Sequence, residues 1–246
     1  FILQTNKLRE IKGGSLLIEQ LSRLCDLLLE EIRSEGGKVT TLSAAAGGAS
    51  LLFERREDAE EMKAVWPMLV ERYAPGLQCI QASVDVKGAQ PVADDWKELQ
   101  SGLQSQKNRW MAAFPEAGPA TFRAPRTGLP AVKFEYLPGG GRERMDQGLL
   151  RRFSTGSEGV KDTLGARLDP DQSWALNMSE DIGEGMVATI HIDGNDLGRR
   201  LQRIQEKFPQ EVSTRIEIFA KALSDGTLEA AKAGYKAALE KLSEKQ

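Results

Sequence analysis

One short stretch of this chain carries the residue types that bind metal ions and phosphates in proteins. It is VATIHIDGNDLG, residues 187–198, in which an apolar run ends at Asp193. A carboxylate at the end of a buried strand, followed by a turn and a helix start, can hold Mg²⁺ while the ion bridges substrate phosphates. The amides of Gly194 and Asn195, and the helix start after Asp196, could cradle phosphate oxygens. The same residues equally suit a polar turn that caps a helix, and both interpretations stay open.

The only histidine of the chain, His191, lies two residues before Asp193, so the two side chains share one face of the predicted strand. A lone histidine in an apolar strand is more often a packed core residue than a ligand, and we treat it as a secondary candidate. With one histidine and no G-x-S-x-G motif, hydrolase chemistry based on serine or cysteine is poorly supported. The glycine patterns of Walker and Rossmann sites are also missing.

The composition sets outer bounds on the class of protein. The chain has 246 residues, of which 40% are hydrophobic, enough for the core of one or two domains. A formal net charge of −3 gives no global attraction to nucleic acid, so such contacts would need a local basic patch. No apolar run approaches the roughly 20 residues of a membrane span, and no signal peptide is visible. We therefore expect a cytoplasmic protein without a membrane partner, in which Cys25 and Cys79 are free thiols.

The first part of the chain alternates between strand and helix patterns. Leucines at helical spacing predict one helix after an opening strand, and Gly36 and Gly37 close it. Two short runs around Gly47 and Gly48 predict a tight hairpin, which a second amphipathic helix and an alternating strand follow. The resulting order, β-α-β-β-α-β, is that of the ferredoxin-like fold, in which two helices cover one face of a four-stranded antiparallel sheet. The expected strands are residues 1–5, 38–45, 50–54 and 77–86. The second helix places Met62, Val65, Leu69 and Tyr73 on one face.

Two glycine pairs in this region are further candidates for positions where the backbone closely approaches a ligand or another segment. Gly13-Gly14 would allow close backbone approach at the start of the first helix, for which Ser15 is a possible N-cap. Basic residues nearby could contact phosphates, although a solvated helix start is the commoner explanation; they are Lys7, Arg9 and Lys12. Gly47-Gly48 precedes Ala49 and Ser50, so this hairpin has no carboxylate for a metal ion and suits a structural turn.

The rest of the chain changes character twice. Residues 94–114 predict a third helix, and residues 115–185 are rich in Gly, Pro and Arg, which predicts an irregular insert with at most one strand and short helical pieces. Six arginines are clustered in this insert, which is either a mobile surface loop or a surface that binds RNA or an acidic partner. They are Arg123, Arg126, Arg142, Arg144, Arg151 and Arg152. A strand at 186–192 and two helices follow, the second with a possible break at Asp225-Gly226.

Three stretches together resemble the large, polymerase- and cyclase-like subunit of type III CRISPR effector complexes. FILQTNKLREIKGGSLLIEQLS is similar to the start of its first palm domain, GGASLLFE to the non-catalytic hairpin of that palm, and ATIHIDGNDLG to the opening strand of its second palm. The resemblance implies an α+β fold with a ferredoxin-like first palm at 1–90, a helix and insert at 91–185, and the start of a second palm at 186–246. It implies a CRISPR-associated antiviral protein, with a nucleoside triphosphate, RNA or other subunits of a defence complex as partners.

In such palms, two acidic residues on adjacent strands bind two divalent ions that activate attack on an α-phosphate. The resemblance makes Asp193 the catalytic, metal-binding residue, assisted by the carbonyl of Ile192 or Gly194, with Mg²⁺ or Mn²⁺ as the ion. It makes Gly194, Asn195, Asp196 and Gly198 the nucleotide-binding residues. Relatives often carry metal-binding cysteines near residues 124–126, where this chain has none, so we expect no zinc.

The second acidic position of the family lies on a Gly-Gly-Asp-Asp or Gly-Gly-Asp-Glu hairpin, and this chain contains no such motif. We expect either that the chain is a piece of a longer protein that carries the hairpin, or that the palm has lost catalysis. The resemblance therefore implies a nucleotidyltransferase- or cyclase-like activity, or else a non-catalytic scaffold that binds RNA or protein within a ribonucleoprotein defence complex.

Overall fold

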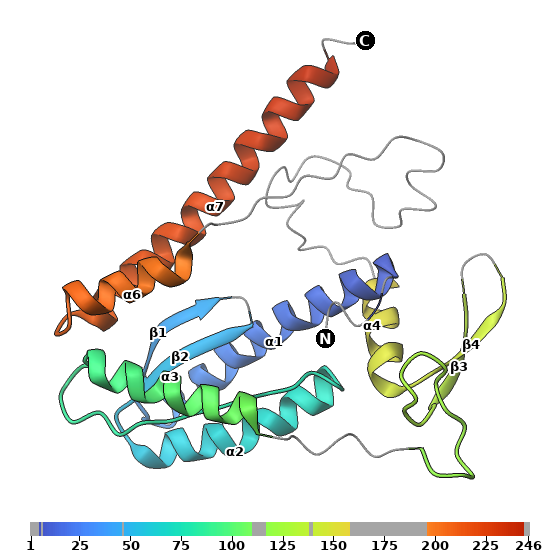
Figure 1. Cartoon of the computed structure of the whole chain (residues 1–246), viewed down its shortest axis with the longest axis horizontal. Helices are drawn as coiled ribbons and strands as arrows, with labels where there is room; N and C mark the ends of the chain where they lie inside the picture. The colour runs from blue at the N-terminus through green and yellow to red at the C-terminus, as the bar shows by residue number, and fades with distance from the viewer. Residues whose placement is uncertain are drawn as a thin grey trace. The chain divides into compact units, whose positions relative to one another are not determined.

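The computed structural model describes residues 5, 7–45, 47–109, 117–137, 140–157 and 196–243. The chain divides into two compact units, residues 1–85 with 94–158 and residues 86–93 with 159–246. The described residues form a mixed α+β structure, with helices and two small antiparallel sheets of two strands each (Figure 1). The α+β class expected from the sequence is therefore confirmed.

The first unit contains the four middle elements of the predicted order. They are α1 (Leu8–Ser34), β1 (Val39–Ala45), β2 (Gly48–Phe53) and α2 (Arg56–Tyr73). The leucine spacing of α1 packs Leu17 and Leu21 against α2, where Val70 completes one core cluster together with Ala74. Gly36 ends α1 with a φ of 84°, and the amide of Gly37 donates to the carbonyl of Ile32 at 2.9 Å. This closure of the helix by glycine is as predicted.

The buried face of α2 differs from the predicted one. Met62 and Val70 are buried, and Trp66 between them packs on two core clusters, whereas Tyr73 is exposed. Pro67 lies inside the helix. Residues 62, 66 and 70 are four apart and form one ridge along α2, and this ridge packs against α1. The predicted residues 62, 65, 69 and 73 do not lie on that ridge, apart from residue 62.

The strand predicted at 77–86 is wrong, because these residues carry no regular secondary structure. Their alternating pattern nevertheless persists. Cys79 packs on the cluster between α1 and α2, while Gln81 donates to the carbonyl of Lys63 at 3.0 Å and Ser83 accepts from the Lys63 ammonium at 3.0 Å. Ala82 faces the other way, toward Gly102. In a ferredoxin-like sheet the last strand pairs with the first, and residues 1–4 lie outside the described part of the chain.

The predicted insert is irregular over residues 117–132, but its later described part is regular. After α3 (Ala93–Asn108) come a hairpin of β3 (Lys133–Tyr136) and β4 (Arg142–Met145), and then α4 (Gln147–Ser157). Met145, Leu149 and Phe153 form a small core beneath the hairpin. The expected strand within GLPAVKFEYL and the helical piece at LLRRF are thus confirmed.

The described part of the second unit is two helices, α6 (Leu197–Lys207) and α7 (Val212–Ser243). Residues 91–93 are held beside them: the Ser213 hydroxyl donates to the Pro91 carbonyl and the Ala93 amide to the Pro209 carbonyl, both at 3.1 Å. The possible break at Asp225-Gly226 is absent, since α7 runs through it. None of the helices in the described ranges has the length and apolar content that crossing a membrane requires.

Candidate functional site

Most of the predicted nucleotide site falls outside the described residues. This holds for His191, Ile192, Asp193, Gly194 and Asn195. Their roles remain predictions, and the described geometry of this region starts at Asp196.

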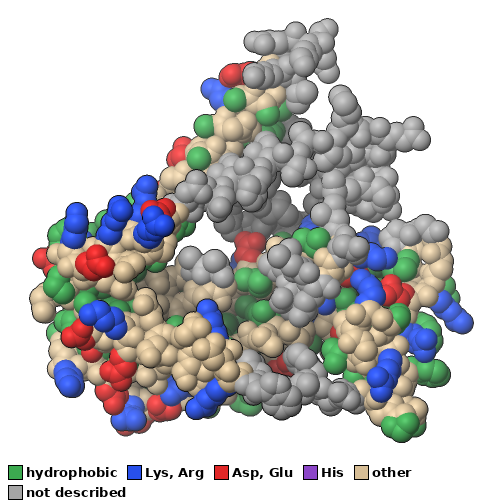
Figure 2. All heavy atoms as spheres, viewed as in Figure 1, with side chains coloured by type: hydrophobic (Ala, Val, Ile, Leu, Met, Phe, Trp, Pro, Cys, Tyr) green, Lys and Arg blue, Asp and Glu red, His purple; other side chains and the backbone are tan. Residues whose placement is uncertain are grey.

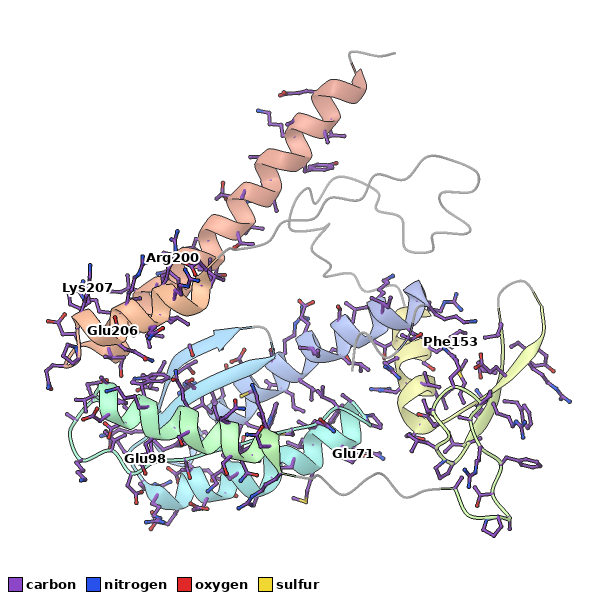
Figure 3. The ribbon with its side chains drawn as sticks, viewed as in Figure 1. Glu71, Glu98, Phe153, Arg200, Glu206 and Lys207 are labelled. Atoms are coloured by element: carbon purple, nitrogen blue, oxygen red, sulfur yellow. The ribbon has the colours of Figure 1, made fainter. Side chains whose placement is uncertain are left out.

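Asp196 lies at the N-cap position of α6 with a φ of 65°, and its side chain makes no capping hydrogen bond. The carboxylate instead pairs with the Arg199 guanidinium at 3.2 Å. A hypothetical Cβ on Gly198 would meet nothing within 4 Å, so the first turn of α6 is open on that side. Further basic side chains project from α6, among them Arg200 and Lys207, labelled in Figure 3. The described part of this turn is therefore open and rich in guanidinium groups.

The glycine of the GGS motif serves helix packing. α1 begins at Leu8, so Ser15 lies inside the helix and the predicted N-cap at Ser15 is wrong. A Cβ on Gly13 would collide with the Arg152 carbonyl of α4, and a Cβ on Gly156 of α4 would collide with the Arg9 carbonyl of α1. The two glycines thus let two helix backbones touch, as Figure 1 shows for α1 and α4. The close backbone approach expected at Gly13 is confirmed, and its partner is a helix.

The second glycine pair forms the turn of the β1–β2 hairpin, as predicted. Gly47 has a φ of 78°, a conformation that favours glycine, and a Cβ there would stand 3.0 Å from the Ile18 side chain. Ala45 pairs with Gly48 across the turn and Ala44 with Ala49. The hairpin tip therefore serves as a structural turn resting on α1.

A buried polar cluster joins α1 to the hairpin. Arg126 donates to both carboxylate oxygens of Glu10 at 2.7 Å and to Glu143 of β4 at 2.6 Å. The Thr5 hydroxyl donates to Glu10 at 2.5 Å. Glu10 is only 1% exposed, and its hydrogen bonds raise the pKa of Arg126, which keeps that guanidinium charged. The cluster fixes the 117–131 loop and β4 on the start of α1.

A second pair of charges extends the cluster along α4. Asp146 caps α4 by accepting from the Leu149 amide at 3.0 Å, and it accepts from the Thr127 hydroxyl at 2.7 Å. Arg152 is buried beside it, and desolvation lowers the pKa of Arg152, opposed by the charges of Glu10 and Asp146. Among the described residues every buried side-chain nitrogen and oxygen has a hydrogen-bond partner. Because the cluster is internally satisfied, we interpret it as a support for the hairpin.

The supported hairpin presents a face that the fold leaves in solvent. Phe134 pairs with Arg144 and Tyr136 with Arg142 across the two strands, so all four side chains point to one side. The Arg142 guanidinium lies over the Phe134 ring at 5.2 Å, and that of Arg144 lies over the Phe122 ring at 5.3 Å. We call these five residues the arginine–aromatic face. The sequence marked the arginines as a cluster but missed the aromatics, whose two-residue spacing on the strand was the available signal.

No protein-family model matches the chain, and no curated protein is significantly similar to it. Within the described ranges, no three side chains of the types His, Cys, Asp or Glu converge as a metal site.

Proposed function

We propose that the chain belongs to a palm-domain protein related to the polymerase- and cyclase-like subunit of type III CRISPR effector complexes. It binds a nucleoside triphosphate with Mg²⁺ or Mn²⁺ at the strand end that carries Asp193. One observation supports the palm more than any other: α1, β1, β2 and α2 follow in the predicted order, with Gly47 at the turn of the hairpin. The ferredoxin-like sheet and the division at residues 90 and 185 are part of this proposal.

The nucleotide part of the proposal draws support from the turn before α6. The open side of Gly198 leaves room for a ligand at the first turn, and the positive end of the helix dipole favours phosphate. In this proposal Asp193 would supply a carboxylate ligand to the ion, the carbonyl of Ile192 or Gly194 a second ligand, and the amides of Gly194 and Asn195 hydrogen bonds to the phosphates. The ion would neutralise the phosphate charge and polarise the α-phosphate.

The test measures thermal stability of the chain with each nucleoside triphosphate, with and without Mg²⁺ or Mn²⁺. A ligand at about 100 times its Kd stabilises the folded state by about 2.7 kcal/mol. We expect a metal-dependent rise that Asp193→Ala abolishes and Asp225→Ala, an exposed aspartate in α7, retains. The same variants in the protein made from the complete reading frame test nucleotide turnover. The proposal fails if the rise is absent or survives in Asp193→Ala.

A non-catalytic scaffold is the second candidate. The Asp196 carboxylate is paired with Arg199, and the Gly47-Gly48 hairpin continues into Ala49 and Ser50, which carry no charge. In this alternative the palm contacts RNA or other subunits of a defence complex. It predicts no metal-dependent rise with any nucleotide, so the experiment above decides between the two candidates.

A further inference from the structure

The two faces of the β3–β4 hairpin have opposite chemistry. On the inner face Met145 is fully buried on α4 and Glu143 is held by Arg126. Lys133 and Glu135 also lie on that side, as an ion pair of 2.9 Å. Among the described residues no ion pair or core contact of this kind is found on the outer side, and this separation follows from the alternation of side chains along a strand. The inner face fixes the hairpin, so the outer face can change without loss of the fold.

The outer side exposes three large aromatic rings. Tyr136 is 77% exposed, Phe122 is 68% exposed and Phe134 is 48% exposed. In the part of the chain that the structure describes, no carboxylate pairs with Arg142 or Arg144, whereas Lys133 and Arg126 are paired. Figure 2 shows lysine and arginine side chains interleaved with hydrophobic ones over this region. Each guanidinium covers one face of a phenylalanine ring, which leaves the other face of the ring and the charge of the guanidinium available to a ligand.

We propose that the arginine–aromatic face binds single-stranded nucleic acid. Bases stack on exposed aromatic rings and on guanidinium planes, and the phosphates pair with Arg142 and Arg144. The ring of Tyr136 and the guanidinium-covered rings of Phe134 and Phe122 offer successive stacking surfaces. A duplex hides its base faces, and an acidic peptide lacks the regular alternation of planar bases and phosphates, so neither matches this surface as well. This inference concerns the first unit and does not rest on the nucleotide site at Asp193.

The binding experiment uses the whole chain and fluorescently labelled 12-nucleotide strands of mixed sequence, as RNA and as DNA. Anisotropy gives Kd at several salt concentrations, with a duplex and an acidic peptide of the same charge as competitors. Since stacking on one aromatic ring is worth about 1–3 kcal/mol, Tyr136→Ala is expected to weaken binding roughly 5- to 150-fold. The double variant Arg142→Ala/Arg144→Ala is expected to reduce the slope of log K against log salt by about 1.4.

The matched control is Lys133→Ala/Lys38→Ala, which removes two positive charges from exposed lysines already paired with glutamates. We expect this control to keep most of the affinity and of the salt slope. Unchanged circular dichroism and Tm in all variants show that the fold is retained. The ratio of RNA to DNA affinity identifies the natural strand. Any one of four results would overturn the proposal. Two concern the variants: equal losses in the control and the Arg142/Arg144 variant, or no effect of Tyr136→Ala. The other two concern the ligand: competition by the duplex or the acidic peptide as strong as that by the single strand, or no binding at low salt.

Discussion

The contact between α1 and α4 makes a quantitative prediction about Gly13. In an isolated helix, replacing glycine with alanine stabilises by about 1 kcal/mol. At Gly13 the new methyl group would stand against the Arg152 carbonyl, which is backbone and cannot rotate away. The helices must then separate, and Arg9 would leave the Phe153 ring over which it lies at 4.8 Å (Phe153 is labelled in Figure 3). Overpacking of this kind costs about 1–3 kcal/mol.

We therefore expect Gly13→Ala to lower stability, with the clash exceeding the helix-propensity gain by up to about 2 kcal/mol. For a unit of this size each kcal/mol shifts Tm by about 2–4 °C. Urea unfolding followed by tryptophan fluorescence reports on this unit, because Trp66 packs in its core and Trp96 is buried in α3. Gly226→Ala is the control, since a Cβ there meets nothing within 4 Å and should stabilise α7. A Gly13→Ala protein more stable than the parent, as Gly226→Ala should be, would refute the packing assigned to this glycine.

Three further predictions concern other groups. Glu10→Gln should lower the free energy of unfolding by at most about 3–5 kcal/mol. Glu143→Gln should lower it by less, because Arg126 then keeps both of its hydrogen bonds to Glu10. Denaturant titration measures both losses, and equal losses would contradict this ranking. Burial raises the pKa of the Cys25 thiol, with a smaller contribution from Asp26, and burial also raises that of Cys79. Above about pH 8.5 the unfolded chain therefore loses thiol protons that the folded chain keeps. The contribution of these thiols to the free energy of unfolding should be fully present below that pH and should fall as the pH rises past it. Replacement of both cysteines by serine should flatten this part of the plot of unfolding free energy against pH. Tyr136→Ala should change the free energy of unfolding by no more than a typical surface substitution, about ±0.5 kcal/mol, since the ring is exposed. A larger loss in denaturant titration would mean that the ring supports the fold.

Local periodicity and glycine chemistry predicted much of the first unit. The leucine pattern of α1, the Gly36 closure and the Gly47 turn each depend on neighbours in sequence, and all three are present. The register of α2 was missed because its face is chosen by Trp66, whose two neighbouring clusters are contributed largely by α1. A strand at 77–86 was predicted from the alternation of apolar and polar residues alone. Alternation indicates which side chains are buried, but it does not show whether the backbone groups pair with another strand.

The hairpin and the buried cluster were harder to predict for a different reason. Glu10 and Arg126 are far apart in sequence, and nothing local to either residue indicates that they meet. The arginines were visible as a composition bias, but only the strand register separates Arg142 and Arg144, which face solvent with the aromatics, from Arg126 and Arg152, which support the fold.

The bond between Arg126 and Glu10 also has a topological consequence. It closes a chain segment of 116 residues, and holding the ends of such a loop together costs on the order of 4 kcal/mol of chain entropy. In a chain whose two cysteines are both free, this ion pair occupies the place that a disulfide holds in many secreted domains. The Arg126–Glu10 ion pair needs no oxidant to form and no reductant to break. It therefore holds this loop closed in any redox environment.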